Sequence, residues 1–178
     1  MFTWNEVFNS SMKALTVATA IVCCVILAGI ASAQEKVNSK YAPAQAILDQ
    51  AIKDHTEILV IAMHVTPPGE KDNVIIASRF NVSPGKWEIQ RIGKIADEDD
   101  MRVIKTGKPN LEVNTTGDRY EVEAAMLDGA GKIVGAVGIV FPYKKGDDQK
   151  ALQKKADRIC EEIRKRTPTL SALFAKPR

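Results

Sequence analysis

The stretch that decides the fold runs from Arg119 to Tyr143 and reads RYEVEAAML, DGAG and KIVGAVGIVFPY in succession. Its first and last parts are rich in apolar, aromatic and β-branched residues, which favour β-strands. The middle part, residues 128–131, has the aspartate and glycines of a tight turn. The stretch therefore predicts a hairpin of two long antiparallel strands at residues 119–127 and 132–143.

Three further strands are predicted upstream of this hairpin. Residues 57–66 contain an almost uninterrupted apolar run, and residues 74–80 contain a second one. A strand that is buried on both faces has this pattern, and the short loop between the two runs suits an antiparallel pair. Residues 110–114 predict the remaining strand. Residues 81–93, with turn residues at 83–85, predict an irregular segment.

Three helices complete the predicted fold. Residues 43–55 place apolar side chains three and four positions apart, which predicts one buried helix face. Residues 97–105 begin acidic and end basic, as the helix dipole favours, and Gly107 suits a left-handed cap. A longer helix is predicted from Asp147 to Pro168. The predicted fold class is α+β, with a five-stranded antiparallel sheet, a long N-terminal helix, a short crossover helix and a C-terminal helix.

An uninterrupted apolar run at residues 14–30 precedes the charged part of the chain. The run is followed by the small residues Ala31 and Ala33, at the two positions that a signal peptidase reads. This pattern predicts a secretory signal peptide at residues 1–33, cleaved before Gln34. The mature protein is then periplasmic or secreted.

Two observations about this N-terminal segment leave alternatives open. Residues 1–11 contain no basic residue, whereas signal peptides begin with one, so Met12 is an alternative start. The apolar run is close to the roughly 17-residue minimum for a spanning helix, so an uncleaved membrane anchor is a second alternative. The residues before Cys23 and Cys24 do not fit a lipid attachment site. Residues 34–178 remain, a length typical of one domain.

Composition excludes several classes of function. The chain has 25 Lys and Arg against 22 Asp and Glu, a formal net charge of +3, which is too small to indicate nucleic-acid binding. Of its three cysteines only Cys160 lies beyond the predicted signal peptide, so no intrachain disulfide is expected. The two histidines, His55 and His64, are too few for a His/Cys zinc site. No metal or cofactor is therefore predicted, and the acidic residues 97–100 are interpreted as a solvated helix start.

A candidate ligand site is predicted from strand alternation and side-chain type. His64 shares a strand face with Val60 and Ala62, where it could line a pocket. Arg79 alternates with two apolar residues, and arginine binds carboxylates through paired hydrogen bonds, so a small anionic ligand is expected. The predicted ligand-binding residues are His64, Arg79, Phe80, Trp87, Arg91, Arg102 and Tyr120. The simpler alternative is that His64 bonds to backbone or water and that each arginine reaches solvent or pairs with a glutamate.

The predicted order of elements resembles the PAS-like fold of extracytoplasmic Cache sensor domains. Three short segments carry the resemblance further, RIGK at residues 91–94, KTGK at 105–108 and DGAGKIVGAVG at 128–138. These motifs are specific for a fold rather than for a ligand. The resemblance covers residues 39–166 and implies a sensor-type binding domain. Receptors of this kind continue into a membrane helix and a cytoplasmic module, which do not follow Arg166, so a free exported binding or accessory protein is expected.

Three functional hypotheses follow. The first is a non-catalytic exported domain that binds a small organic ligand between its sheet and residues 81–107. The second is an interaction module, in which the sheet or an apolar tail at residues 170–174 docks on a membrane sensor or on a second copy of the chain. The third is a haem protein with His64 or Met63 as axial ligand. No enzyme is predicted, because neither histidine belongs to a catalytic motif.

Overall fold

The computed structural model describes residues 40–175. The predicted signal peptide, its cleavage site and the alternative start at Met12 lie outside the described residues. The elements in chain order are α2 (Ala42–Asp54), β1 (Val60–Val65), β2 (Val74–Ser83), β3 (Lys86–Glu88), α3 (Glu98–Thr106), β4 (Asn110–Val113), β5 (Arg119–Leu127), β6 (Ile133–Pro142), α4 (Gln149–Arg166) and the 3₁₀ helix η1 (Leu170–Phe174). The predicted α+β class is confirmed.

The sheet has six strands in the order β3-β2-β1-β6-β5-β4, and all neighbouring strands are antiparallel. The prediction of five strands is wrong, because β2 continues to Ser83 and turns back as β3. Pro84 and Gly85 form this turn, and Gly85 has a φ of 78°, which glycine adopts without strain. The segment predicted to be irregular therefore begins with an edge hairpin.

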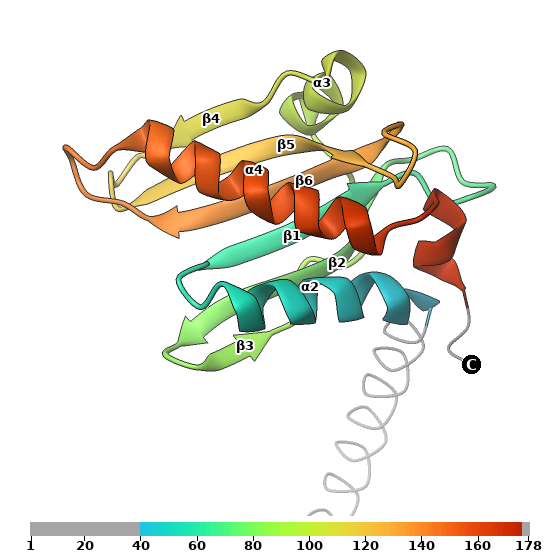
Figure 1. The fold of residues 1–178 in the computed structure, drawn as a ribbon, viewed down its shortest axis with the longest axis horizontal. Coiled ribbons are helices and arrows are strands. Elements are labelled where there is room, and N and C mark those ends of the chain that lie inside the picture. The colour runs from blue at the N-terminus through green and yellow to red at the C-terminus, as the bar shows by residue number, and fades with distance from the viewer. Residues whose placement is uncertain (1–39, 176–178) are drawn as a thin grey trace, which may run out of the picture. The chain divides into compact units, whose positions relative to one another are not determined.

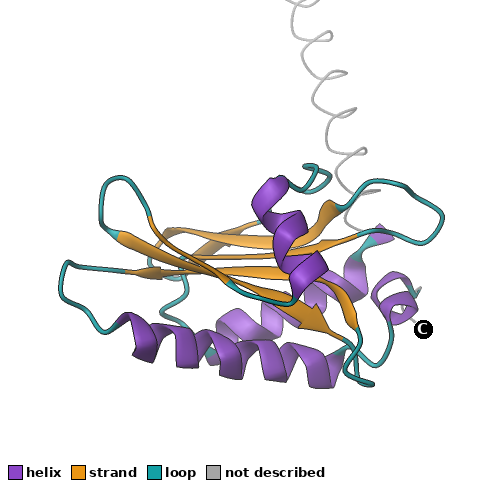
Figure 2. Cartoon of the chain, turned by 90° about the horizontal axis from the view of Figure 1, so that it is seen from above, coloured by secondary structure: helices purple, strands orange, loops and turns teal. Residues whose placement is uncertain are grey.

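Helices cover the two faces of the sheet unequally. The long helices α2 and α4 lie side by side on one face (Figure 1), and the short helix α3 lies on the opposite face (Figure 2). The apolar core fills the space between the sheet and the two long helices. Its fully buried side chains include Leu48, Ile58, Ile61, Met63, Ile139, Ile159 and Ile163. Burying each of them contributes about 1.5–3 kcal/mol to folding.

A β-bulge in β2 reverses the alternation of its side chains. Met63 pairs with Ala77, but the next residue of β1, His64, pairs with Ile75, which leaves Ile76 without a partner of its own. An extra residue of this kind moves the side chains beyond it to the opposite face. Ala77 therefore belongs to the core with Met63, whereas Ile75 lies on the other face with His64.

Helix α3 is fixed by a cap at each end, and the left-handed cap at Gly107 is the one that the sequence predicted. The Asp97 carboxylate accepts hydrogen bonds from the backbone N–H groups of Asp99 and Asp100, at 3.1 Å and 3.2 Å. The backbone N–H of Asp97 donates in return to Asp100 Oδ2 at 2.8 Å. Gly107 ends the helix in the left-handed conformation, with a φ of 70°. This capping box holds the Asp100 carboxylate at the start of the helix.

The C-terminal segment docks on its own domain. Leu173 of η1 is fully buried in the core, and the Phe174 ring packs edge-on against the Tyr41 ring at a centroid distance of 5.9 Å. His55, which follows α2, is joined to α4 through its Nε2, which lies 2.9 Å from Glu162 Oε2. Among residues 40–175, no helix has the length and apolar character that crossing a membrane requires.

Candidate functional site

A cavity of about 270 Å³ lies on the face of the sheet opposite to α2 and α4. Strands β1 and β6 form its floor, and β4, β5, the start of α3 and the segment before α3 (residues 89–97) form its walls. The lining residues are Val60, Ala62, His64, Ile75, Phe80, Arg91, Lys94, Asp97, Asp100, Glu112, Asn114, Arg119, Glu121, Gly138 and Val140. The cavity thus combines an apolar floor with charged walls.

Strand alternation and one glycine produce the floor. In β1, Ala62 and His64 point into the cavity, and Met63 between them points into the core. Gly138 of β6 pairs with Ala62, and a Cβ at Gly138 would lie 3.2 Å from Glu121 Oε1. The missing side chain at Gly138 therefore leaves room for the Glu121 carboxylate over the floor.

The segment before α3 forms a basic wall with Arg91 and Lys94. Two backbone hydrogen bonds fasten this segment to β2, from Gly93 N to Ile75 O at 2.8 Å and from Ile75 N to Lys94 O at 2.9 Å. Arg91 has a φ of 62°, an uncommon angle for a residue with a side chain. Its guanidinium lies 5.0 Å from the centre of the Phe80 ring, a favourable cation–π distance. These contacts hold a positive charge beside the β2 side of the floor.

The opposite wall is acidic. Glu112 of β4 and Glu121 of β5 are directly opposite each other in the sheet, and both line the cavity. Desolvation within the cavity raises the pKa of Glu121, and the neighbouring Glu112 raises it further. Arg119 and Asn114 line the cavity at the end of the same strand pair, next to the β4–β5 turn. Like charges opposite each other destabilise a sheet, so this pair is costly without a counter-charge.

Three polar side chains meet at the buried end of the cavity. His64 of β1, Asp100 of α3 and Glu123 of β5 are only 7%, 8% and 5% exposed. His64 Nδ1 lies 3.4 Å from Asp100 Oδ2, and one nitrogen or oxygen of each residue lies within 4.8 Å of the other two. Neither His64 Nδ1 nor Glu123 Oε1 has a hydrogen-bond partner among the described residues. The acidic run interpreted as solvated therefore contains one buried carboxylate, Asp100.

The two carboxyl groups of this cluster share one proton at neutral pH. Burial raises the pKa of Glu123 to about 9, and its hydrogen bond with Asp100 adds to the rise. For Asp100 burial acts in the same upward direction, but the hydrogen bond with Glu123 brings the pKa below its ordinary value. Burial lowers the pKa of His64 against the opposing charge of Asp100. Glu123 is thus protonated, Asp100 ionised and His64 neutral.

The structure brings three of the predicted ligand-binding residues together. His64, Phe80 and Arg91 all line the cavity. Met63, which the haem hypothesis offered as an alternative axial ligand, is fully buried in the core on the other side of the sheet from His64. Met63 therefore cannot contact a group in this cavity.

Arg79 and Trp87 lie on the helix side of the sheet, so their predicted place in the ligand site is corrected. Both line a surface hollow beside Asp49 of α2. The Arg79 guanidinium donates two hydrogen bonds to the Asp49 carboxylate, at 2.6 Å and 2.9 Å. The prediction failed because the bulge in β2 lies between Ile75 and Arg79. Without the bulge, these two residues would lie on the same face of the sheet, as was expected.

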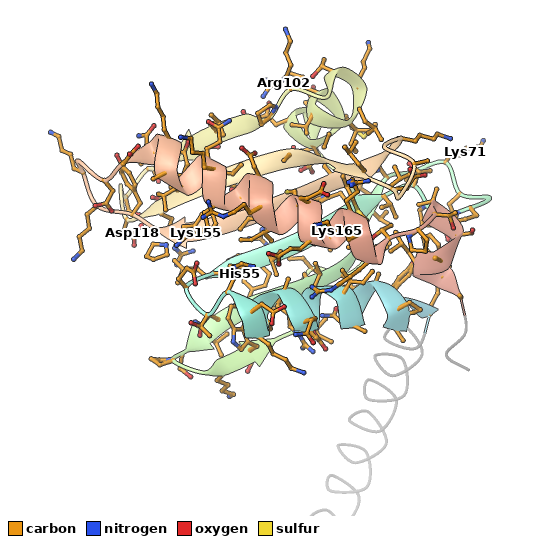
Figure 3. All side chains as sticks on the ribbon, in the orientation of Figure 1. His55, Lys71, Arg102, Asp118, Lys155 and Lys165 are labelled. Atoms are coloured by element: carbon orange, nitrogen blue, oxygen red, sulfur yellow. The ribbon has the colours of Figure 1, made fainter. Side chains whose placement is uncertain are left out.

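Tyr120 and Arg102 also lie outside the cavity. Tyr120 is 2% exposed and belongs to the core, because the alternation of β5 turns it toward the helices and turns Glu121 toward the cavity. Arg102 is exposed on the outer side of α3 (Figure 3) and contacts Asp99 at 3.0 Å and Asn110 at 2.8 Å. Neither residue can hold a ligand in the cavity.

Several residues of the cavity and of the buried cluster were not predicted from the sequence, namely Lys94, Asp100, Glu112, Asn114, Arg119, Glu121 and Glu123. The sequence does contain a pattern that indicates two of these residues, Glu121 and Glu123. Glu121 and Glu123 stand at alternate positions of a strand whose other alternate residues, Tyr120 and Val122, are apolar. Two acidic residues on the same face of a central hairpin indicate that this face is not packed against a helix.

Replacing Arg79 by methionine is expected to destabilise the domain by about 1 kcal/mol, because a two-point, half-buried ion pair with Asp49 is lost. Urea unfolding followed by circular dichroism measures this change. The matched control is Arg102→Met, which removes an exposed pair with Asp99 and should change stability by less than about 0.5 kcal/mol. Equal effects of the two substitutions would contradict a structural role specific to Arg79.

No protein-family model matches the sequence, and no curated protein matches it. Solved structures with a similar chain path include the Agobacterium tumefaciens repressor BlcR, at 10% identity and a TM-score of 0.48, covering 70% of this chain and 66% of that chain. The A. aeolicus nlh2 GAF domain has 11% identity and a TM-score of 0.46, covering 65% of this chain and 76% of that one.

A third similar structure is the inducer-binding domain of the transcription factor PobR from Acinetobacter, as a double mutant in complex with 3-hydroxybenzoic acid. It has 9% identity and a TM-score of 0.44, and the match covers 73% of this chain and 98% of that one. Likeness at this level carries no function over to this chain. The resemblance to Cache domains stays a prediction.

Proposed function

We propose that this domain binds a small organic zwitterion, with one carboxylate and one ammonium group, in the cavity between the sheet and the segment before α3. We further propose that it binds this molecule without transforming it and that it does so outside the cytoplasm. The apolar run at residues 14–30, followed by Ala31 and Ala33, supports the last part.

The observation that carries the proposal is the separation of charge across the cavity. Arg91 and Lys94 lie on the wall beside β2, which also contains Asp97, whereas Glu112 and Glu121 lie on the wall formed by β4 and β5, which also contains Arg119. Strands β1 and β6 lie between the two walls in the sheet. A ligand with a carboxylate at one end and an ammonium at the other matches both walls, while a simple anion would face the acidic wall unpaired.

The cavity volume also limits the ligand. About 270 Å³ is at or below the lower end of the range of roughly 300–1,000 Å³ that is usual for small-molecule pockets. The apolar floor of Val60, Ala62 and Val140 suits a short hydrocarbon chain between the two charged ends. An amino acid or a short ω-amino acid fits these requirements.

Binding without catalysis is supported by the chemistry of the lining. Among the described residues that line the cavity, none is a serine, threonine, cysteine or tyrosine, so His64 has no hydroxyl or thiol nucleophile beside it to activate. The open cavity also favours a ligand-binding domain over the interaction module, for which a cavity filled by side chains was expected.

Isothermal titration calorimetry with a matched series of compounds tests the proposal. The series contains α-amino acids, ω-amino acids of increasing chain length, and the corresponding carboxylic acids and amines with only one charge. We expect one chain length to bind best, and the singly charged analogues to bind at least tenfold more weakly, because about 1.4 kcal/mol is lost with either ion pair.

Two variants that each remove one charge assign the ends of the ligand. Arg91→Gln should weaken binding of the zwitterion and of the acid but leave the amine unaffected, and Glu121→Gln should do the reverse. Arg102→Gln and Glu88→Gln, which change exposed charges outside the cavity, are the controls. A folded protein that binds no member of the series, or variants that weaken all members alike, would exclude the zwitterion.

A further inference from the structure

The cluster at the buried end of the cavity contains two polar atoms without hydrogen-bond partners among the described residues. His64, Asp100 and Glu123 are each more than nine-tenths buried. They come from three different elements, β1, α3 and β5. His64 Nδ1 and Glu123 Oε1 point into this cluster and have no hydrogen-bond partner among the described residues. Leaving such groups unpaired in a buried place is destabilising. A group that satisfies all three side chains at once would remove this cost.

We propose that His64, Asp100 and Glu123 bind one divalent first-row transition-metal ion, with zinc as its probe, through one imidazole nitrogen and two carboxylate oxygens. The proposal does not depend on the organic ligand of the preceding section. The metal site is separate from the proposed organic-ligand site, because the metal would occupy the buried end of the cavity rather than its charged walls.

The distances agree with this assignment. Ligand atoms about 2.0–2.1 Å from a tetrahedral zinc ion lie about 3.3 Å from one another. His64 Nδ1 and Asp100 Oδ2 already lie 3.4 Å apart, and the three donor atoms lie within 4.8 Å of one another. The fourth coordination position then faces the cavity, where His64 and Asp100 form part of the lining.

Charge and chemistry favour a divalent ion with mixed nitrogen and oxygen ligands. When the ion displaces the proton of Glu123 to solvent, two carboxylates neutralise its charge, and the buried His64 imidazole offers a nitrogen lone pair. An imidazole among the ligands favours zinc and its neighbours over calcium or magnesium, and the absence of sulfur disfavours copper(I). The backbone N–H of Asp97 donates a hydrogen bond to Asp100 Oδ2 at 2.8 Å and so fixes the orientation of this carboxylate.

The sequence analysis rejected a zinc site because it counted only histidine and cysteine as ligands. That count is correct, since the chain has two histidines and the second one, His55, pairs with Glu162 on the other side of the sheet. The two carboxylates come from residues 100 and 123, far apart in the sequence, and only the packing of α3 against β5 brings them to His64. No spacing motif could have revealed this cluster.

The test uses the full-length protein after proteolytic removal of any affinity tag and dialysis against EDTA and then against metal-free buffer. Zinc chloride is titrated by calorimetry, and cobalt(II) is titrated by absorption spectroscopy. We expect one ion per chain and a cobalt spectrum of four-coordinate nitrogen and oxygen ligands without a thiolate charge-transfer band. His64→Gln and Glu123→Gln should each weaken zinc binding at least tenfold.

The matched control is His55→Gln, which removes the only other histidine of the chain and should change the zinc affinity less than threefold. Glu123→Gln keeps the shape of the side chain and a hydrogen-bond donor to Asp100, so a folded variant is expected, and thermal unfolding confirms it. Binding that survives both His64→Gln and Glu123→Gln, or that is lost in His55→Gln, would overturn the proposal. An absence of zinc binding to the wild type would also overturn the proposal. The cluster would then hold only the proton shared by Asp100 and Glu123.

Discussion

Replacing Gly135 by alanine is expected to destabilise the domain by about 3 kcal/mol or more, a large fraction of the 5–15 kcal/mol that usually stabilises a domain. Gly135 lies in β6 and pairs with Val65 of β1. A Cβ at Gly135 would lie 2.0 Å from the carbonyl oxygen of His64 and 2.7 Å from Val65 Cγ1. Because the nearest atom belongs to the backbone, the two central strands would have to separate, and no side-chain rotation can relieve the clash.

Gly138→Ala is the matched control for this substitution, since it changes the same residue type in the same strand. A Cβ at Gly138 would meet only the end of the Glu121 side chain, at 3.2 Å, and that side chain can rotate. We expect Gly138→Ala to change stability by less than about 1 kcal/mol. Urea unfolding of both variants provides the comparison. A Gly135→Ala variant as stable as Gly138→Ala would show that the close approach of β1 and β6 is not required.

Replacing Glu123 by glutamine is expected to stabilise the metal-free protein at pH 7 by about 2–3 kcal/mol, because Glu123 is uncharged in the folded state but ionised in the unfolded chain. Burial and the hydrogen bond with Asp100 raise the pKa of Glu123 to about 9 in the folded state. The unfolded chain has the ordinary pKa, so it releases the proton near pH 4.5 while the folded protein still holds it. The folded state therefore loses stability relative to the unfolded state as the pH rises from about 4.5 to about 9.

The pH dependence distinguishes this explanation from improved packing. With EDTA present, the wild type should lose stability by about 1 kcal/mol for each pH unit above 5, whereas Glu123→Gln should lose much less. The two proteins should be nearly equal in stability at pH 4.5. Glu88→Gln, an exposed glutamate on the edge strand β3, is the control and should leave the pH profile of the wild type unchanged. Parallel profiles for the wild type and Glu123→Gln would exclude a raised pKa at Glu123.

The elements of the fold were predictable because each one is specified by residues close together in the chain. Strand β5 has the bounds that were expected, and α3 ends at the Gly107 cap that was named. The alternation of β1 correctly placed His64 opposite to the core. Local patterns of this kind depend on neighbours within a few positions, and a sequence displays them directly.

The candidate site was only partly predictable because it depends on contacts between distant residues and on one irregularity. The bulge beside Ile75 sends Arg79 to the helix side, and no residue in β2 marks this position in advance. Asp100 looks like any solvated residue of a helix start until α3 is packed over the sheet. Glu123 acquires its unusual protonation only from that packing. The side chains with the most unusual environments are therefore those that the sequence analysis missed.

The position of β1 between β2 and β6 has a consequence for biosynthesis. Strands β1 and β2 are close in sequence and can pair early, but β6 is among the last strands to leave the ribosome. Until then, the other edge of β1 presents unpaired backbone groups flanked by the apolar side chains of Ile61 and Met63. Such an edge invites pairing with another nascent chain. A central strand of the finished sheet is thus an exposed edge while the chain is incomplete.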